Sequence, residues 1–189
     1  FQNIADNYTE TLSRFSYSRY VGNTLVVAVA TTALMMIITI FSAFAFARLK
    51  FRGRDLLFTI FLATMMIPGE MMVITNYQTM SNLDLISKNQ TKAQAFFVMI
   101  VPFITSVFYI YLLRQNFKQI PNELYLAAKV DGKSDWEYLW KVMVPLSSPT
   151  LITIAILSII GSWNAYVWPK IAVSASKNAE DFWLISVAL

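Results

Sequence analysis

The chain has 189 residues, of which 57% are hydrophobic and 14% are charged, and its formal net charge is +4. This composition is too apolar for an ordinary soluble domain and predicts a protein that crosses a lipid bilayer several times. The chain contains no cysteine and no histidine, which excludes disulfides, the usual zinc sites and the Ser–His and Cys–His catalytic pairs. Because the basic residues stand beside apolar segments, where they set membrane topology, we expect no nucleic-acid partner.

The first predicted membrane span covers residues 21–47, an almost unbroken apolar segment that exceeds the roughly 20 residues a helix needs to cross the hydrocarbon core. Residues 1–20 are mixed polar and aromatic and lack the order of a signal peptide. A short basic loop follows the span and contains Arg48, Lys50, Arg52 and Arg54. By the positive-inside rule this loop faces the cytoplasm, so residues 1–20 are expected outside.

The second predicted span covers residues 56–75 and returns outward. Pro68 and Gly69 interrupt it where a helix in lipid would lose hydrogen bonds, and Glu70 stands at that break. Two interpretations of Glu70 remain open: it marks the outer end of the span, or it takes part in a transport pathway. The polar residues 76–92 are expected to form an outside loop.

The third predicted span covers residues 93–113 and crosses inward, with a possible kink at Pro102. The loop 114–146 is thereby placed in the cytoplasm. The fourth predicted span covers residues 149–168 and returns outward, and Trp163 and Trp168 fit an aromatic belt at its outer end. After a polar external segment, residues 182–189 have the composition of the start of a further span.

A polar and amphipathic segment, residues 121–145, separates the third and fourth spans. A short helix is predicted from about Pro121 to Val130, because proline suits the first turn of a helix. Gly132 is placed to end this helix in a left-handed conformation.

A second helix is predicted to begin at Ser134, because Ser134 and Glu137 have the S-x-x-E spacing of a capping box. Pro145 is expected to end this helix, and Ser148-Pro149 to begin the fourth span. Apolar residues at helical spacing predict one face that lies along the membrane surface: Trp136, Leu139, Trp140 and Met143.

Three groups of residues in this segment resemble the EAA loop of permease subunits in binding-protein-dependent ATP-binding-cassette importers: Ala127-Ala128, Asp131-Gly132 and Val142-Met143-Val144-Pro145. Residues 162–169, SWNAYVWP, are similar to the W-N-x-x-x-W-P stretch typical of the sugar-importing, maltose-type branch. The likeness extends over about residues 21–169. In one departure, Leu126 stands where the motif has a glutamate.

The resemblance implies an all-α, polytopic transmembrane bundle of the type I importer permease fold, with a cytoplasmic coupling helix. It implies a single permease domain over residues 1–189, with one more span before Phe1 and one after Leu189. It also implies that the chain forms the pathway of an ATP-driven carbohydrate importer with a second permease subunit, in a prokaryotic plasma (inner) membrane. Two ATPase subunits and an extracellular or periplasmic solute-binding protein complete the expected complex, and the chain itself is no enzyme.

No phosphate-binding G-x-x-x-x-G-K-[ST] motif occurs in the sequence, so we expect this chain to bind no cofactor and the partner ATPase subunits to hold ATP and Mg²⁺. The residues expected to couple to the ATPase are Glu123, Leu124, Tyr125, Leu126, Ala127, Ala128, Lys129, Asp131 and Gly132. Two adjacent alanines make a low ridge that can enter a cleft on a partner. At Leu126 two hypotheses stay open: that cleft is apolar, or the companion permease alone makes the polar contact. The alternative for the whole segment is an amphipathic linker resting on the membrane.

Trp163 and Asn164 are candidate substrate-pathway residues, because aromatic faces and amides suit sugars. Interface anchoring for Trp163 and hydrogen bonding between helices for Asn164 are the alternatives.

Three rival functions are a membrane enzyme, a non-transport membrane scaffold and an ion-coupled secondary transporter. A secondary transporter usually needs ionisable groups or broken helices in the membrane. No metal site is expected.

Overall fold

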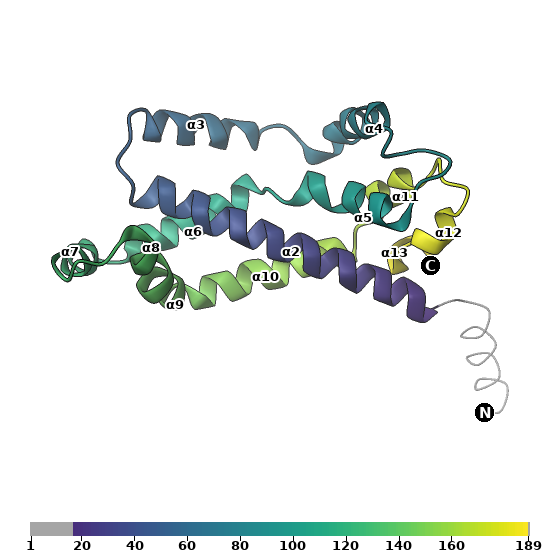
Figure 1. Ribbon diagram of the computed structural model, residues 1–189. Coiled ribbons are helices and arrows are strands. Elements are labelled where there is room, and N and C mark those ends of the chain that lie inside the picture. The colour runs from purple at the N-terminus through teal and green to yellow at the C-terminus, as the bar shows by residue number, and fades with distance from the viewer. Residues whose placement is uncertain (1–16, 189) are drawn as a thin grey trace. The chain divides into compact units, whose positions relative to one another are not determined.

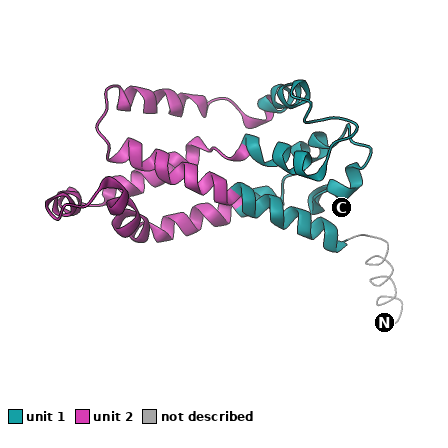
Figure 2. Cartoon of the chain, in the orientation of Figure 1, with its two compact units in different colours: residues 1–31, 72–102, 159–189 teal, residues 32–71, 103–158 magenta. Residues whose placement is uncertain are grey.

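The computed structural model describes residues 17–188, which form helices joined by short turns and contain no strand (Figure 1). The all-α prediction is confirmed. The described chain divides into two compact units (Figure 2). Unit 1 comprises residues 17–31, 72–102 and 159–188, and unit 2 comprises residues 32–71 and 103–158. The predictions for residues 1–16 and for Leu189 lie outside the described residues.

Helix α2 (Tyr17–Ala47) contains the first predicted span and begins four residues before it. Among the described residues it is the one helix that is long and apolar enough by itself to cross a membrane. Three further pairs of helices pass the same test only when each pair, bent at a short break, is taken as one span, which gives up to four. The four-span topology stays a prediction.

The second predicted span is a broken helix. Helix α3 (Arg54–Thr64) ends before Pro68, and the chain continues in η1 (Gly69–Met71) and α4 (Met72–Asn82). The break at Pro68 was expected, because proline has no N–H to donate and crowds the preceding turn. The prediction of a loop from Asn76 was wrong, since α4 extends to Asn82 and buries Met80 among apolar residues of unit 1.

The third predicted span is also broken, at the proline that was expected to kink it. Helix α5 (Lys92–Ile100) passes into η2 (Val101–Phe103), which contains Pro102. Helix α6 (Val107–Gln119) then begins at Ser106, whose hydroxyl accepts a hydrogen bond from the backbone of the first turn.

The segment between the third and fourth predicted spans contains four short elements. They are α7 (Asn122–Val130), α8 (Asp135–Tyr138), the π-helix η3 (Leu139–Met143) and α9 (Val144–Leu146). Helix α10 (Ser148–Trp163) follows after a bend of 76°.

Pro145 does not end the second helix of this segment, as had been predicted. It lies inside the continuous helical segment, directly after the wider π-helical turn η3, which interrupts the regular ladder of backbone hydrogen bonds. The break falls instead at Ser147, whose side chain is buried. A helix, α10, begins at Ser148-Pro149 as predicted, while its role as the fourth membrane span stays a prediction.

The predicted apolar face of this second helix is divided in two. Leu139 and Met143 are buried in the core of unit 2. Trp136 and Trp140 are 60% and 37% exposed, and their rings pack on each other and on Phe41 of α2 with centroids 5.7 to 6.3 Å apart. The π-helical turn changes the angle between successive residues, so a 3.6-residue spacing does not keep these four on one side.

The last three helices are short: α11 (Val167–Ala172), α12 (Ala179–Phe182) and α13 (Ile185–Ala188). The prediction that Trp168 belongs to an aromatic belt at the outer end of the fourth span was wrong, because its side chain is buried in the core of unit 1. Trp168 is 4% exposed and its indole Nε1 donates to the carbonyl of Val98 at 3.1 Å. A tryptophan whose N–H finds a buried acceptor can lie in a core.

Candidate coupling site

Helix α7 ends as the sequence predicted. Gly132 has φ +74°, the left-handed conformation that glycine adopts without strain. The backbone N–H of Gly132 donates to the carbonyl of Lys129 at 3.1 Å, and the N–H of Lys133 donates to that of Ala128 at 2.9 Å. These two bonds form a Schellman motif, which satisfies the last carbonyls of the helix and turns the chain sharply. The predicted capping box at Ser134 and Glu137 is likewise present and starts α8.

Two side chains of α7 tie it to α8. The hydroxyl of Tyr125 donates to Asp135 Oδ1 at 2.8 Å, and Lys129 Nζ lies 2.8 Å from the same oxygen. The Tyr125 ring meets that of Tyr138 edge to face at 5.1 Å. The ammonium group of Lys129 and then the Tyr125 hydroxyl hold the pKa of Asp135 below its usual value. Tyr125 and Lys129, predicted as coupling residues, therefore also fasten α7 within its own chain.

The opposite side of α7 is exposed and partly apolar. We call Glu123, Leu126, Ala127 and Val130 the outer face of α7, because they recur at i, i+3, i+4 and i+7. Leu126 is 56% and Val130 88% exposed. Within unit 2, α7 lies at one end, next to α8 (Figure 1).

The remaining predicted coupling residues are divided between the two sides. Leu124, Asp131 and Gly132 are exposed, whereas Ala128 is buried against the core of unit 2. The sequence prediction missed Val130, although its spacing of four residues from Leu126 places both on one helical face.

Arg48 holds the joint between α6 and α7. Its guanidinium Nη2 donates to the carbonyl of Phe117 at 3.0 Å and to that of Ile120, and Nη1 donates to Asn122 Oδ1 at 3.4 Å. Carbonyls at a helix end have no partner within the helix, so a cation with several donors satisfies them and fixes where the chain leaves. Sequence reasoning treated Arg48 as a topology signal and missed this contact, because its partners lie about 70 residues away.

Arg114, on α6, makes a second set of contacts between α6 and earlier parts of the chain. Its side chain is 6% exposed, Nη2 lies 3.5 Å from Asp55 Oδ1, and Nε donates to the carbonyl of Phe46 at 3.2 Å. The guanidinium carbon lies 3.8 Å from the ring centre of Phe58, within the range of a cation–π contact. Arg114 thus joins α6 to α3 and to the end of α2.

The two predicted pathway residues lie at the end of α10, in unit 1. Trp163 is half-buried and is the last residue of the helix, and Asn164 is exposed. Asn164 Nδ2 donates to the carbonyl of Ile160 at 3.0 Å, so the amide closes the helix end of its own chain.

Permease subunits of carbohydrate and glycerol-phosphate transport systems are among the curated proteins to which this chain is similar. The chain is 28% identical to the arabinooligosaccharides transport system permease protein AraQ of Halalkalibacterium halodurans. This alignment of 181 residues covers 92% of this chain and 62% of that protein. It is 30% identical over 152 residues to the sn-glycerol-3-phosphate transport system permease protein UgpE of Yersinia pestis, covering 80% of this chain and 52% of that protein. The chain thus spans between half and two thirds of the length of these curated relatives.

A solved structure has the same fold. The crystal structure of a bacterial ABC transporter involved in the import of the acidic polysaccharide alginate contains a chain that matches with a TM-score of 0.76 and 28% identity, over 89% of this chain and 56% of that chain. Residues 35–186 match the family described as the binding-protein-dependent transport system inner membrane component, and these residues include the outer face of α7, Gly132, Trp163 and Asn164. The chain belongs to this family of binding-protein-dependent inner membrane transport components, and its fold is that of the type I importer permease.

Proposed function

We propose that this chain is the central part of the permease subunit of an ATP-driven carbohydrate importer in a prokaryotic inner membrane. It crosses the membrane several times and forms the translocation pathway with a second permease subunit. A solute-binding protein outside delivers the substrate, and two ATPase subunits inside bind ATP and Mg²⁺. Membership of the family and the permease names of the relatives support this proposal.

The observation that carries the proposal is the construction of α7. Its inner side is fastened through Asp135, its end is fixed by the Schellman turn, and its outer face carries exposed Leu126 and Val130. A rigid helix with an apolar exposed ridge fits a groove on a partner better than it fits water. We infer that the groove belongs to the ATPase subunit.

We expect a movement of the docked partner to be transmitted to α10 through a short, continuous set of contacts. A hydrogen bond and an ion pair to Asp135 join α7 to α8. Elements α8, η3 and α9 then follow without a break as far as Ser147. Leu139 and Met143, on η3, pack in one core with Leu151 and Ile154 of α10. A displacement of α7 is therefore expected to tilt α10, at whose far end the proposed pathway residues Trp163 and Asn164 lie.

A carbohydrate is the proposed substrate class. The named cargo of AraQ is arabinooligosaccharides, and that of the solved importer is the acidic polysaccharide alginate. The cargo of UgpE is sn-glycerol-3-phosphate, so uptake assays need both chemical classes. Uptake of a sugar polymer fragment supports the proposal, and uptake of glycerol phosphate alone contradicts it.

Substitution of Leu126 tests the nature of the contact. If the partner's groove is apolar, Leu126→Glu in the full-length assembled complex places a carboxylate where it finds no sure partner, so ATPase retention and substrate-stimulated hydrolysis should fall about tenfold or more. Leu126→Ala removes only apolar contact and should weaken both less, since burying a leucine contributes about 1.5–3 kcal/mol.

Leu83→Glu is the matched control, because Leu83 is a similarly exposed leucine outside the 121–145 segment, 63% exposed. It should leave both measurements unchanged. Stronger coupling in Leu126→Glu would show that a basic group faces this position and that the apolar groove is wrong.

A further inference from the structure

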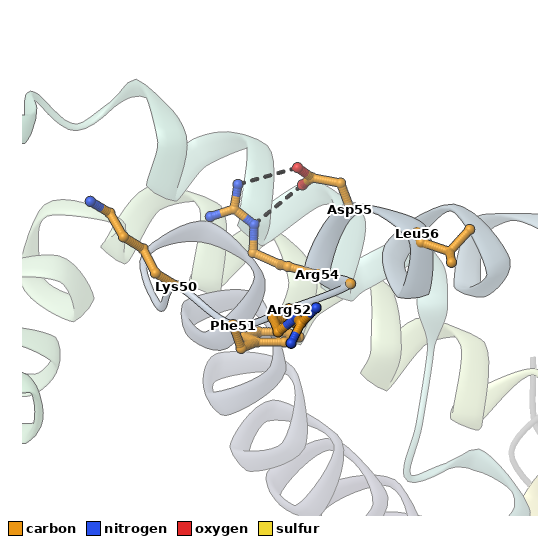
Figure 3. A pocket seen from close by; sticks show the side chains of 7 residues that line it. Lys50, Phe51, Arg52, Arg54, Asp55 and Leu56 are labelled. Carbon is orange, nitrogen blue, oxygen red and sulfur yellow. Dashed lines mark hydrogen bonds and ion pairs between the residues drawn. The ribbon is translucent and has the colours of Figure 1, made fainter.

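A basic hollow opens in the turn between α2 and α3, lined by residues 50–56 (Figure 3). Three cationic side chains and one carboxylate line it: Lys50, Arg52, Arg54 and Asp55. The hollow is a wide surface depression and does not enclose a ligand on all sides. Because three cations outnumber one carboxylate, the net charge of its lining is positive. Because the depression is open, a ligand bound in it would stay partly in contact with its surroundings.

The single carboxylate of the hollow, that of Asp55, already forms ion pairs with two arginines. Asp55 lies 3.2 Å from Arg54 Nε and 3.5 Å from Arg114 Nη2, and Figure 3 shows the Arg54 side chain turned to Asp55 while Lys50 extends away from that pair. In the described part of the chain, no carboxylate pairs with Lys50 or Arg52, and both are exposed. Two cations of the hollow thus lack a counter-charge from the protein.

Apolar side chains flank these cations. Phe51 is 41% and Leu56 67% exposed, and both line the hollow with Lys50 and Arg52. The exposed apolar surface continues along α3 at Leu57 and Ile60. Cations beside such a surface match the two parts of a phospholipid, a charged headgroup and a hydrocarbon chain.

We propose that this hollow binds the headgroup of an anionic phospholipid, with Lys50 and Arg52 facing its phosphate and the exposed side of α3 beside its acyl chains. The inference rests on the proposed function and on the predicted topology, in which this turn faces the cytoplasm. Positive-inside topology accounts for the charges but requires neither a hollow nor apolar side chains among them. A soluble phosphate would leave Phe51 and Leu56 facing water, so a lipid fits the lining better.

The test measures lipid selectivity directly. The full-length assembled complex is placed in nanodiscs of phosphatidylcholine with a small share of spin-labelled phosphatidylglycerol or, separately, spin-labelled phosphatidylcholine. The ratio of the two motionally restricted fractions gives the preference for the anionic lipid. Each cation near a membrane surface attracts anionic lipid by about 1 kcal/mol, so Lys50→Gln with Arg52→Gln removes about 2 kcal/mol and should lower the preference about thirtyfold. Lys88→Gln with Lys92→Gln, two basic residues elsewhere in the chain, should leave it unchanged.

A second measurement uses the unaltered protein, so it does not depend on the variants folding. Photoactivatable phosphatidylglycerol should label the peptide that contains residues 50–57, and excess inorganic phosphate should not compete. An unchanged lipid preference in the double variant, or labelling confined to other peptides, overturns the proposal. Competition by inorganic phosphate, or protection of the turn by a bound protein subunit in place of lipid, also overturns it. Because neither readout uses ATP hydrolysis, a failure here is distinct from a failure of the coupling function.

Discussion

Replacing Arg48 with methionine should reduce substrate-stimulated ATP hydrolysis by the assembled complex about tenfold to a hundredfold, while the chain still inserts in the membrane. Methionine keeps an apolar stem but removes the donors to Phe117, Ile120 and Asn122. A hydrogen bond from a charged group contributes about 1.5–3 kcal/mol, and its loss leaves helix-end carbonyls without a partner. The joint between α6 and α7 would then no longer hold α7 in one orientation.

The measurement compares hydrolysis and ATPase retention in complexes that carry Arg48→Met, Arg48→Lys or Lys88→Met. Arg48→Lys should be intermediate, because an ammonium group cannot reach three acceptors at once. Lys88 is exposed and its substitution should have no effect. Full coupling in Arg48→Met at normal expression would show that the joint is held by other contacts.

Replacing Gly132 with valine should have the second-largest effect, a loss of coupling of about tenfold at unchanged membrane insertion. A left-handed backbone costs a residue with a Cβ about 1–2 kcal/mol, and a β-branched residue is especially unsuited to it. A Cβ built at Gly132 meets no atom within 4 Å, so the expected penalty comes from the backbone and not from a clash. The Schellman turn would open, and α7 would lose its fixed angle to α8.

Two controls separate backbone conformation from side-chain size. Gly132→Asn should retain most coupling, since asparagine tolerates the left-handed region. Gly22→Val places the same side chain at a glycine of α2 that likewise has nothing within 4 Å and no positive φ, and it should be neutral. Equal loss in Gly132→Asn and Gly132→Val would refute the conformational explanation. ATPase retention and substrate-stimulated hydrolysis are the quantities to compare.

Local signals predicted the turn and the helix start of the 121–145 segment well. The turn at Gly132 and the capping box at Ser134 depend on residues within a few positions of each other, so their spacing in the sequence is enough. The helix breaks at Pro68 and Pro102 were predictable for the same reason. The outer face of α7 was only partly predicted, because the motif drew attention to Ala127-Ala128 and away from Val130.

Features that depend on distant residues were not predictable in this way. Arg48 and Arg114 contact atoms about 60 to 70 residues away in the chain, and nothing near them in the sequence indicates those partners. Helix α4 was missed because its polar residues favoured a loop. Trp168 was misplaced because tryptophan suits both an interface and a core, and its buried contacts, including the hydrogen bond to the carbonyl of Val98, are not visible in the sequence.

The most direct test of the account is cross-linking from the outer face of α7 in the full-length assembled complex. The 189-residue segment contains no cysteine, so within it Val130→Cys introduces a single thiol at its 88% exposed position. A photoactivatable group attached to that thiol should join this chain to the ATPase subunit, and the same group at Leu83→Cys should not. An ATPase subunit that stays in the complex but forms no adduct with Val130→Cys would contradict the assignment of α7 as the coupling helix.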